Sequence, residues 1–182
     1  MARRNPFQVD RHVTPRVPAL PDERYRDDQA RPVADIAADD CVLFLWSTIQ
    51  HNDVAIDVMR AWGFEYRSQI IWKKPSIGLG FWFRAMHEIL LVGVRGNPPC
   101  PANGTQWPSV IEAERGEHSA KPEVFLEMID EYFPTLPKIE LNRRGPPRPG
   151  WAAWGNEAEV ESDSAPPAEP EFAPGAADQT LA

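Results

Sequence analysis

Two apolar runs with few polar interruptions stand out along the chain. Residues 41–46 are apolar throughout, and residues 88–94 are apolar after an initial Glu88. Runs of this length without alternation are typical of strands buried on both faces, as in the middle of a parallel sheet. Two further strands are predicted over residues 66–72 and 138–141. The pattern therefore predicts a sheet with a buried centre.

Between these strands, two stretches have the spacing of amphipathic helices. Residues 53–62 place their apolar side chains on one face, with Asn52 or Asp53 as the N-cap and Gly63 as the stop signal. Residues 122–133 show the same spacing. The order strand, helix, strand, strand, helix, strand predicts an α/β fold with helices on both faces of the sheet.

Ligands of such sheets bind beyond the carboxyl ends of the strands. We therefore expect the site to contain four segments and the arginines beside them. The segments are Ser47-Thr48, Lys73-Lys74, the long loop over residues 95–118, and the residues that follow Leu141. The arginines are Arg84, Arg95, Arg143 and Arg144.

The charge of the chain is concentrated near its C-terminal end. The 182 residues carry 27 acidic and 19 basic side chains, a net charge of −8. Residues 158–182 contain six of the acids and no Lys or Arg, which predicts a disordered acidic tail. Residues 1–32 are rich in Arg and Pro and predict an extended arm or a loop packed on a neighbour, so the folded domain is expected over residues 33–157. Without the tail the charge is close to neutral, which leaves nucleic acid open as a partner.

Cysteine usage and hydropathy indicate the compartment. Two cysteines, Cys41 and Cys100, are too few for a disulfide scaffold or a Cys-rich zinc site, and no His spacing suggests a metal ion. No secretory signal and no apolar run of membrane-spanning length is visible. We therefore expect a cytoplasmic chain that does not bind membranes.

Two segments have the chemistry of a ligand site. In residues 118–122, Lys121 stands where a loop enters a helix, so an anionic group could bind there, although an ordinary solvated helix start is the commoner alternative. In residues 151–157, Trp151 and Trp154 stand beside Asn156 and Glu157. This segment could hold a nucleoside or could form an apolar flap over the sheet.

A third segment, residues 78–84, combines two glycines, three aromatic residues and an arginine. It could be a loop on which nucleobases stack. Packing of Phe81 and Phe83 in the core is the favoured alternative.

A series of short motifs occurs in a fixed order along residues 33–157. The motifs are Val42-Leu-Phe-Leu-Trp46, Ala61-Trp-Gly-Phe64, Ile71-Trp-Lys-Lys74, Phe81-Trp-Phe-Arg84 with His87-Glu88, Leu91-Val-Gly-Val-Arg-Gly96, Ser109-Val-Ile111, Glu117-His-Ser-Ala-Lys-Pro122, Ile139-Glu-Leu141, Pro149-Gly-Trp151 and Trp154-Gly-Asn-Glu157. This series resembles the MT-A-seventy (MT-A70) family of adenine methyltransferases.

The resemblance implies a Rossmann-like methyltransferase sheet with permuted motif order. It implies S-adenosyl-L-methionine as the methyl donor and the exocyclic amine of adenine as the acceptor, in DNA in preference to RNA. By position, Lys121 would hold the methionine end of the donor, Glu140 and Arg144 the ribose side, and Asn156 with Glu157 the adenosine part. A second methyltransferase-like subunit is a further candidate partner.

Two departures from the family pattern change the expectation. Asn142 follows Leu141 where the family usually has Phe, and the catalytic string Asp-Pro-Pro-Trp does not occur in the 182 residues. We therefore expect a domain without its first strand, no catalytic residue in this chain, no methyl transfer by it alone, and weak donor binding or none. The alternative function is a non-catalytic subunit that binds nucleic acid or an active partner.

Overall fold

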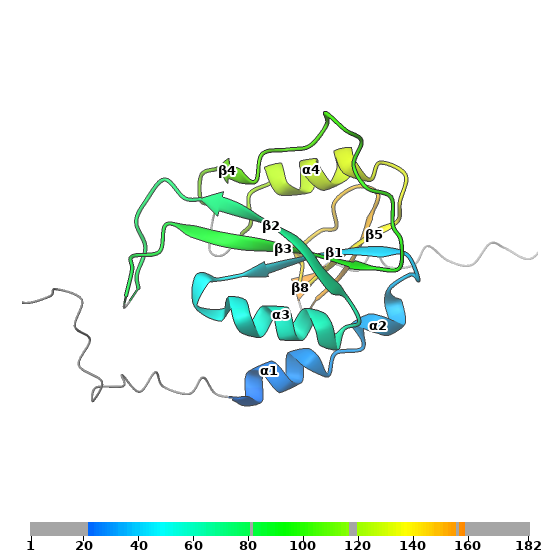
Figure 1. The fold of residues 1–182 in the computed structure, drawn as a ribbon, viewed down its shortest axis with the longest axis horizontal. Coiled ribbons are helices and arrows are strands. Elements are labelled where there is room, and N and C mark those ends of the chain that lie inside the picture. The colour runs from blue at the N-terminus through cyan, green and yellow to red at the C-terminus, as the bar shows by residue number, and fades with distance from the viewer. Residues whose placement is uncertain (1–21, 81, 117–119, 156, 159–182) are drawn as a thin grey trace, which may run out of the picture. The chain divides into compact units, whose positions relative to one another are not determined.

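The computed structural model describes residues 22–80, 82–116, 120–155 and 157–158 (Figure 1). Side chains are left out at residues 22–24, 144, 157 and 158. The chain divides into two compact units, residues 1–134 and 135–182, which are considered one at a time. Most of the predicted acidic tail, residues 159–182, lies outside the described residues.

The first unit is built on a four-stranded sheet. Its strands are β1 (Cys41–Ser47), β2 (Glu65–Lys73), β3 (His87–Arg95) and β4 (Val110–Glu112), in the order β1-β3-β2-β4. All three strands predicted in this unit are confirmed. β3 runs antiparallel to both of its neighbours, and β4 runs parallel to β2.

The expectation of a parallel centre is therefore wrong, because β2 and β3 are joined by a loop and not by a crossover helix. A strand that returns directly after a loop must pair antiparallel to the one before it. β4 was not predicted either. Its three residues lie inside the long loop, where the backbone N–H of Ile71 donates to Ser109 at 2.8 Å and the indole Nε1 of Trp72 donates to the carbonyl of Ala113 at 2.9 Å.

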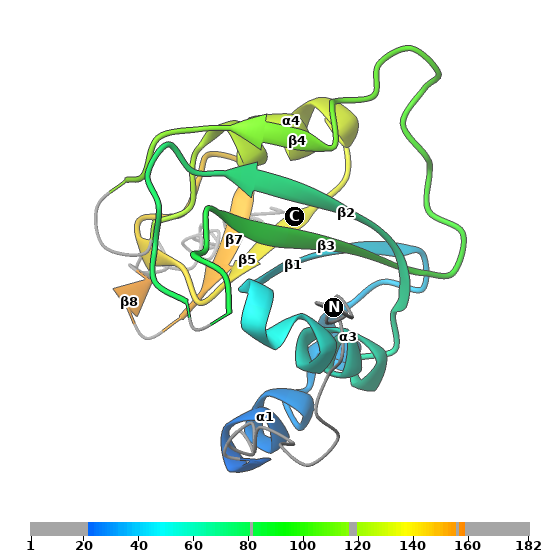
Figure 2. The same ribbon diagram turned by 60° about the vertical axis from the view of Figure 1, so that its left-hand side comes forward.

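The two predicted helices are confirmed and lie on opposite faces of this sheet (Figures 1 and 2). Helix α3 (Asn52–Ala61) connects β1 to β2, and helix α4 (Val124–Tyr132) lies across the other face. An α/β unit with both faces of its sheet covered explains why β1 and β3 are apolar without alternation.

Each face has its own packing centre. On one face, Met59 of α3 is fully buried over Gly93 in β3. On the other, the ring of Phe125 in α4 meets Trp46 of β1 edge-on, with 4.9 Å between ring centroids. The buried apolar side chains are Val33, Val58, Met59, Trp62, Phe64, Trp72, Ile89, Leu90, Leu91, Ile111, Phe125, Met128, Ile129 and Phe133.

The start of α3 differs from the sequence expectation, while its end agrees with it. His51 is the N-cap residue, no side chain caps the helix, and Asn52 is the first helical residue. The hydroxyl of Thr48 pairs with Nδ1 of His51 at 2.8 Å in the preceding 3-10 turn, η1 (Ile49–His51). Gly63 has a φ of +83°, as a glycine after a helix C-terminus requires.

Regular structure begins earlier than Val33, where the sequence placed its start. Helix α1 (Asp22–Gln29) lies in the predicted arm, and helix α2 (Val33–Ile36) follows it. The carbonyl of Asp28 accepts a hydrogen bond from the indole of Trp62 at 2.8 Å. Helix α1 was missed because it has no apolar periodicity of its own and is held by contacts with other segments, among them α3 and the ring of His51, which lies 5.9 Å from that of Tyr25.

The second unit consists of two short parallel strand pairs. Strand β5 (Lys138–Leu141) was predicted and pairs with β7 (Trp151–Trp154), while β6 (Arg144–Gly145) pairs with β8 (Glu157–Ala158). Gly155 is required there, because a Cβ atom would lie 2.8 Å from the carbonyl oxygen of Arg143.

In the part of the chain that the structure describes, no helix is long and apolar enough to cross a membrane.

Gly93→Ala is expected to destabilise the chain by about 1–3 kcal/mol, because the added Cβ would lie 2.8 Å from the sulfur of the buried Met59. Urea unfolding measures the change. In a Met59→Ala background the same substitution is expected to cost clearly less, since the clashing side chain is gone. An equal cost in both backgrounds would show that the contact between Met59 and Gly93 does not determine it.

Candidate anion-binding site

A single carboxylate stands at the entrance of the apolar strand β3. Glu88 has only 15% of its side chain exposed, and each of its oxygens accepts a hydrogen bond from a different lysine. Nζ of Lys74 lies 2.6 Å from Oε1, and Nζ of Lys121 lies 2.5 Å from Oε2. We refer to Lys74, Glu88 and Lys121 as the Lys–Glu–Lys cluster.

The register of the sheet determines where this cluster forms. Trp72 of β2 is directly opposite Glu88 of β3, and Trp46 of β1 is opposite Leu90, so these side chains share the face that α4 covers. Lys74 follows the last residue of β2, and Lys121 precedes α4. Three separate segments therefore bring one charge each to the same point.

Two tryptophans lie beside the lysines. Nζ of Lys74 is 4.7 Å from the centre of the Trp72 ring, and Nζ of Lys121 is 5.2 Å from that of Trp46. The two rings meet at a steep angle with centroids 6.0 Å apart. A cation over an indole face is attracted by the ring quadrupole, so the rings hold both ammonium groups in place.

A small cavity of about 120 Å³ opens at the cluster. Its lining residues are Trp72, Lys74, Glu88, Arg115, Gly116, Ala120 and Lys121. Among the described residues that line the cavity, three cationic side chains accompany one carboxylate, a positive excess after the ion pairs are formed. A small anion, such as a carboxylate or a phosphate group, suits such a cavity.

Glu88 is ionised at neutral pH. Burial alone would raise the pKa of this carboxyl group, but the hydrogen bonds from Lys121 and Lys74 outweigh burial and hold the pKa below its ordinary value. The cluster is therefore a charged triad and not a neutral hydrogen-bonded one.

Of the residues that the sequence assigned to the methyl donor, Lys121 lies in this cavity. Lys74 is there too, as expected for a residue beyond the carboxyl end of β2. Arg95 is not, and that expectation is wrong. β3 is antiparallel to β1 and β2, so Arg95 lies opposite Cys41 at the far end of the sheet and donates to the carbonyl of Ala34 at 2.9 Å.

The other predicted site residues belong to the second unit. Oε2 of Glu140 accepts a hydrogen bond from Nη1 of Arg143 at 3.1 Å, and Nε of Arg143 donates to the carbonyl of Pro146. Arg144 and Glu157 are described by their backbone alone, as members of β6 and β8. Asn156 lies outside the described residues. Their assignment to a ligand stays a prediction.

Glu88 was not placed at the site from the sequence, and Lys74 was expected there as part of the Lys73-Lys74 segment but not as a partner of Glu88. A signal for Glu88 was present, because it is the only acid in the apolar strand β3 and a charge in a buried strand needs a partner. Its partners could not be inferred, because Lys74 and Lys121 are 14 and 33 positions away. Among the described residues, no group of three His, Cys, Asp or Glu side chains could hold a metal ion.

Comparison with known proteins identifies the family of this chain. The family model named MT-A70 matches residues 10–157. The Type II methyltransferase M.MunI of a Mycoplasma species is 34% identical over 138 residues, which cover 75% of this chain and 59% of that protein. The human N(6)-adenosine-methyltransferase catalytic subunit METTL3 is 33% identical over 148 residues, or 76% of this chain and 25% of that protein.

The match to the family model covers most of the chain, and the chain belongs to the MT-A70 family. A Drosophila melanogaster relative, the N(6)-adenosine-methyltransferase MT-A70-like protein, is 32% identical over 148 residues, 76% of this chain and 24% of its own length. The chain thus spans about three fifths of the bacterial relative and about a quarter of the two animal ones.

Proposed function

We propose that the chain serves adenine methylation, with S-adenosyl-L-methionine as the methyl donor and the exocyclic amine of adenine in DNA, rather than RNA, as the acceptor. Family membership and the names of the methyltransferase relatives support this function. The observation that carries it is the cation-rich cavity at Lys121, the residue that the family resemblance assigns to the methionine end of the donor.

The cavity fits one end of the donor. A methionine carboxylate is a small anion, and the side chain of Lys121, which is about one third exposed, lines the cavity together with Arg115. About 120 Å³ is well below the roughly 300–1,000 Å³ of complete small-molecule sites, so the ribose and adenine need further residues. We assign these to Glu140, Arg144, Asn156 and Glu157. A Rossmann-like sheet with permuted motif order is part of the same proposal.

The residues of this chain bind and orient; they do not take the catalytic role. The donor supplies an activated methyl group on a sulfonium when it is bound. Lys121 would neutralise its carboxylate, and Glu88 would keep Lys121 and Lys74 apart and in place. The string Asp-Pro-Pro-Trp does not occur among the 182 residues, which favours a second candidate function, a non-catalytic subunit that works with another methyltransferase-like chain in the cytoplasm.

Lys121→Ala is expected to weaken binding of S-adenosyl-L-methionine about tenfold, because one charge-assisted hydrogen bond to the donor is lost. Calorimetric titration with the donor measures the affinity, which we expect to be weak in the unmodified chain. The matched control is Lys73→Ala, which removes an equally long lysine at the end of β2, paired with Glu112 of β4 at 2.8 Å and outside the cavity.

The control should bind the donor as the unmodified chain does. Equal donor affinity in the Lys121 variant and the control would contradict the assignment of this cavity to the donor. Donor binding is the readout because turnover needs a catalytic motif that these 182 residues lack.

A further inference from the structure

The loop between β2 and β3, residues 75–86, has a defined internal structure. We refer to it as the aromatic loop. The N–H of Lys74 donates to Met86 at 2.7 Å and closes its base, and the N–H of Gly78 donates to Ala85, also at 2.7 Å. Nε of Arg84 donates to the carbonyl of Gly78 at 2.6 Å. The two arms of the loop are thus tied together along their length.

Its two glycines allow the arms to approach this closely. A Cβ atom on Gly78 would lie 2.7 Å from the carbonyl oxygen of Ala85, and one on Gly80 would lie 1.9 Å from that of Phe83. A residue with a Cβ atom at either position would force the backbone to shift. The glycines therefore allow the backbone segments on the two sides of the tip to lie together.

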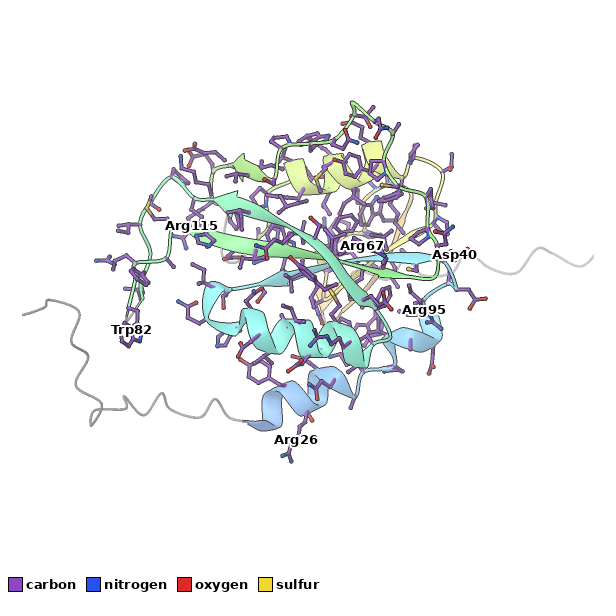
Figure 3. The ribbon with its side chains drawn as sticks, viewed as in Figure 1. Arg26, Asp40, Arg67, Trp82, Arg95 and Arg115 are labelled. Carbon is purple, nitrogen blue, oxygen red and sulfur yellow. The ribbon has the colours of Figure 1, made fainter. Side chains whose placement is uncertain are left out.

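This shape holds two aromatic side chains in water. Trp82 is 78% exposed and Phe83 is 86% exposed, and Figure 3 shows Trp82 at the outer end of the loop, away from the sheet. The expectation that Phe83 packs in the core is therefore wrong, and Phe81 lies outside the described residues. Large apolar groups that lie together in solvent mark a binding surface.

The charges around the loop indicate what binds. From residue 66 to residue 87 the chain has four Lys or Arg side chains and no acid, although its net charge is −8. Two of the four, Lys73 and Lys74, pair with Glu112 and Glu88 on neighbouring strands. Arg84 is the only charged residue of the aromatic loop, and it is exposed. Lys74, at the base of the loop, belongs to the Lys–Glu–Lys cluster, so the aromatic tip and the cationic cavity are joined by one short segment.

We propose that Trp82 and Phe83 stack on unpaired bases of a nucleic-acid strand, whose phosphates meet Arg84. Exposed aromatic rings beside a cation are how proteins hold single strands irrespective of sequence. A duplex hides its base faces, so the surface selects single-stranded or locally opened nucleic acid. The choice of nucleic acid rests on the proposed function, while the stacking surface rests on the loop itself.

The test measures binding of a fluorescent single-stranded oligonucleotide of about 12 nucleotides, within the usual site sizes, by anisotropy with the full chain and no methyl donor. The double variant Trp82→Ala/Phe83→Ala is expected to bind tenfold or more weakly. Leu79→Ala is the matched control: this residue is 86% exposed on the same loop but has no ring, and its affinity should change less than twofold.

A second experiment distinguishes base stacking from non-specific apolar binding. An oligonucleotide with abasic sites at its centre should bind the unmodified chain as weakly as the double variant binds the intact strand. The affinity of the double variant should be the same for the abasic strand as for the intact strand. Thermal unfolding of the variants should match that of the unmodified chain, because the replaced side chains are exposed.

Three results would overturn the proposal. The first is oligonucleotide affinity that the double variant leaves unchanged, or no detectable binding by the unmodified chain. The second is an equal loss in Leu79→Ala. The third is a change of sedimentation coefficient in the double variant with unchanged oligonucleotide affinity, which would make the loop a protein interface. The oligonucleotide experiment contains no methyl donor. Its result therefore does not depend on the outcome of the donor titration with Lys121→Ala.

Discussion

Glu88→Gln is expected to lower the free energy of unfolding at pH 7 by about 2–3 kcal/mol. The amide keeps the shape of the carboxyl group but removes its charge, so the ammonium groups of Lys74 and Lys121 face each other without an anion. Lys74 has only 13% of its side chain exposed, so water compensates it poorly. Urea unfolding followed by circular dichroism measures the loss.

The matched control is Glu112→Gln. It breaks another Lys–Glu pair at the end of β2, with Lys73, at a similar distance of 2.8 Å. Both members of that pair are about half exposed, so the expected cost is below about 1 kcal/mol. Equal losses in the two variants would show that burial of the Lys–Glu–Lys cluster does not contribute to stability.

The difference between the unmodified chain and Glu88→Gln should also depend on pH. The pKa of Glu88 is lower in the folded chain than the value of about 4.3 expected when unfolded. Its stabilising effect is therefore complete above that value and is lost as the pH falls through the lower pKa of the folded state. We expect the gap between the two proteins to close in acid, and a gap that stays constant down to pH 3 would contradict the assignment.

Phe125→Ala is expected to destabilise the chain by about 3–5 kcal/mol. Phe125 is 1% exposed and meets Trp46 edge-on, so the truncation leaves a cavity between α4 and the sheet and removes an aromatic pair. Because Trp46 also lies beside Lys121, the loss should reach the anion site.

Phe83→Ala is the control for Phe125→Ala, since it removes the same atoms from a ring that is almost fully exposed. Its expected effect on the free energy of unfolding is within about 0.5 kcal/mol. Urea unfolding of the two variants gives a direct comparison. A loss of more than 2 kcal/mol in Phe83→Ala would show that the aromatic loop packs against the molecule in solution, and would count against its role as a binding surface.

Apolar patterning was sufficient to find β1, α3, β2, β3, α4 and β5, because each of these elements buries a continuous face. It could not find α1, which has little apolar character of its own, or β4, whose three residues are held by β2. The predicted parallel pairing in the centre of the sheet was wrong because an apolar pattern does not contain the direction of a strand. Pattern records which side chains are buried, whereas direction depends on whether a loop or a helix joins two strands.

The site was found in part. Lys121 was predicted because its place before a helix is visible locally, while its two closest partners, Glu88 and Trp46, become neighbours only through the register of the sheet. Phe83 was assigned to the core because aromatic residues usually are buried. The backbone contacts at Gly78 and Gly80 that hold it in solvent are specific to this loop and leave no periodic trace in the sequence.

β1 and β2 do not pair with each other; β3, which comes after both in the chain, lies between them and pairs with each. During synthesis, both strands must therefore wait, with their apolar side chains unpaired, until residues 87–95 have been made. β3 can then pair with both, and β4 joins β2 once residues 110–112 have been made. A ribosomal pause or a cleavage before residue 87 would leave β1 and β2 without β3 as a partner. Their exposed apolar side chains would then favour aggregation unless a chaperone binds them.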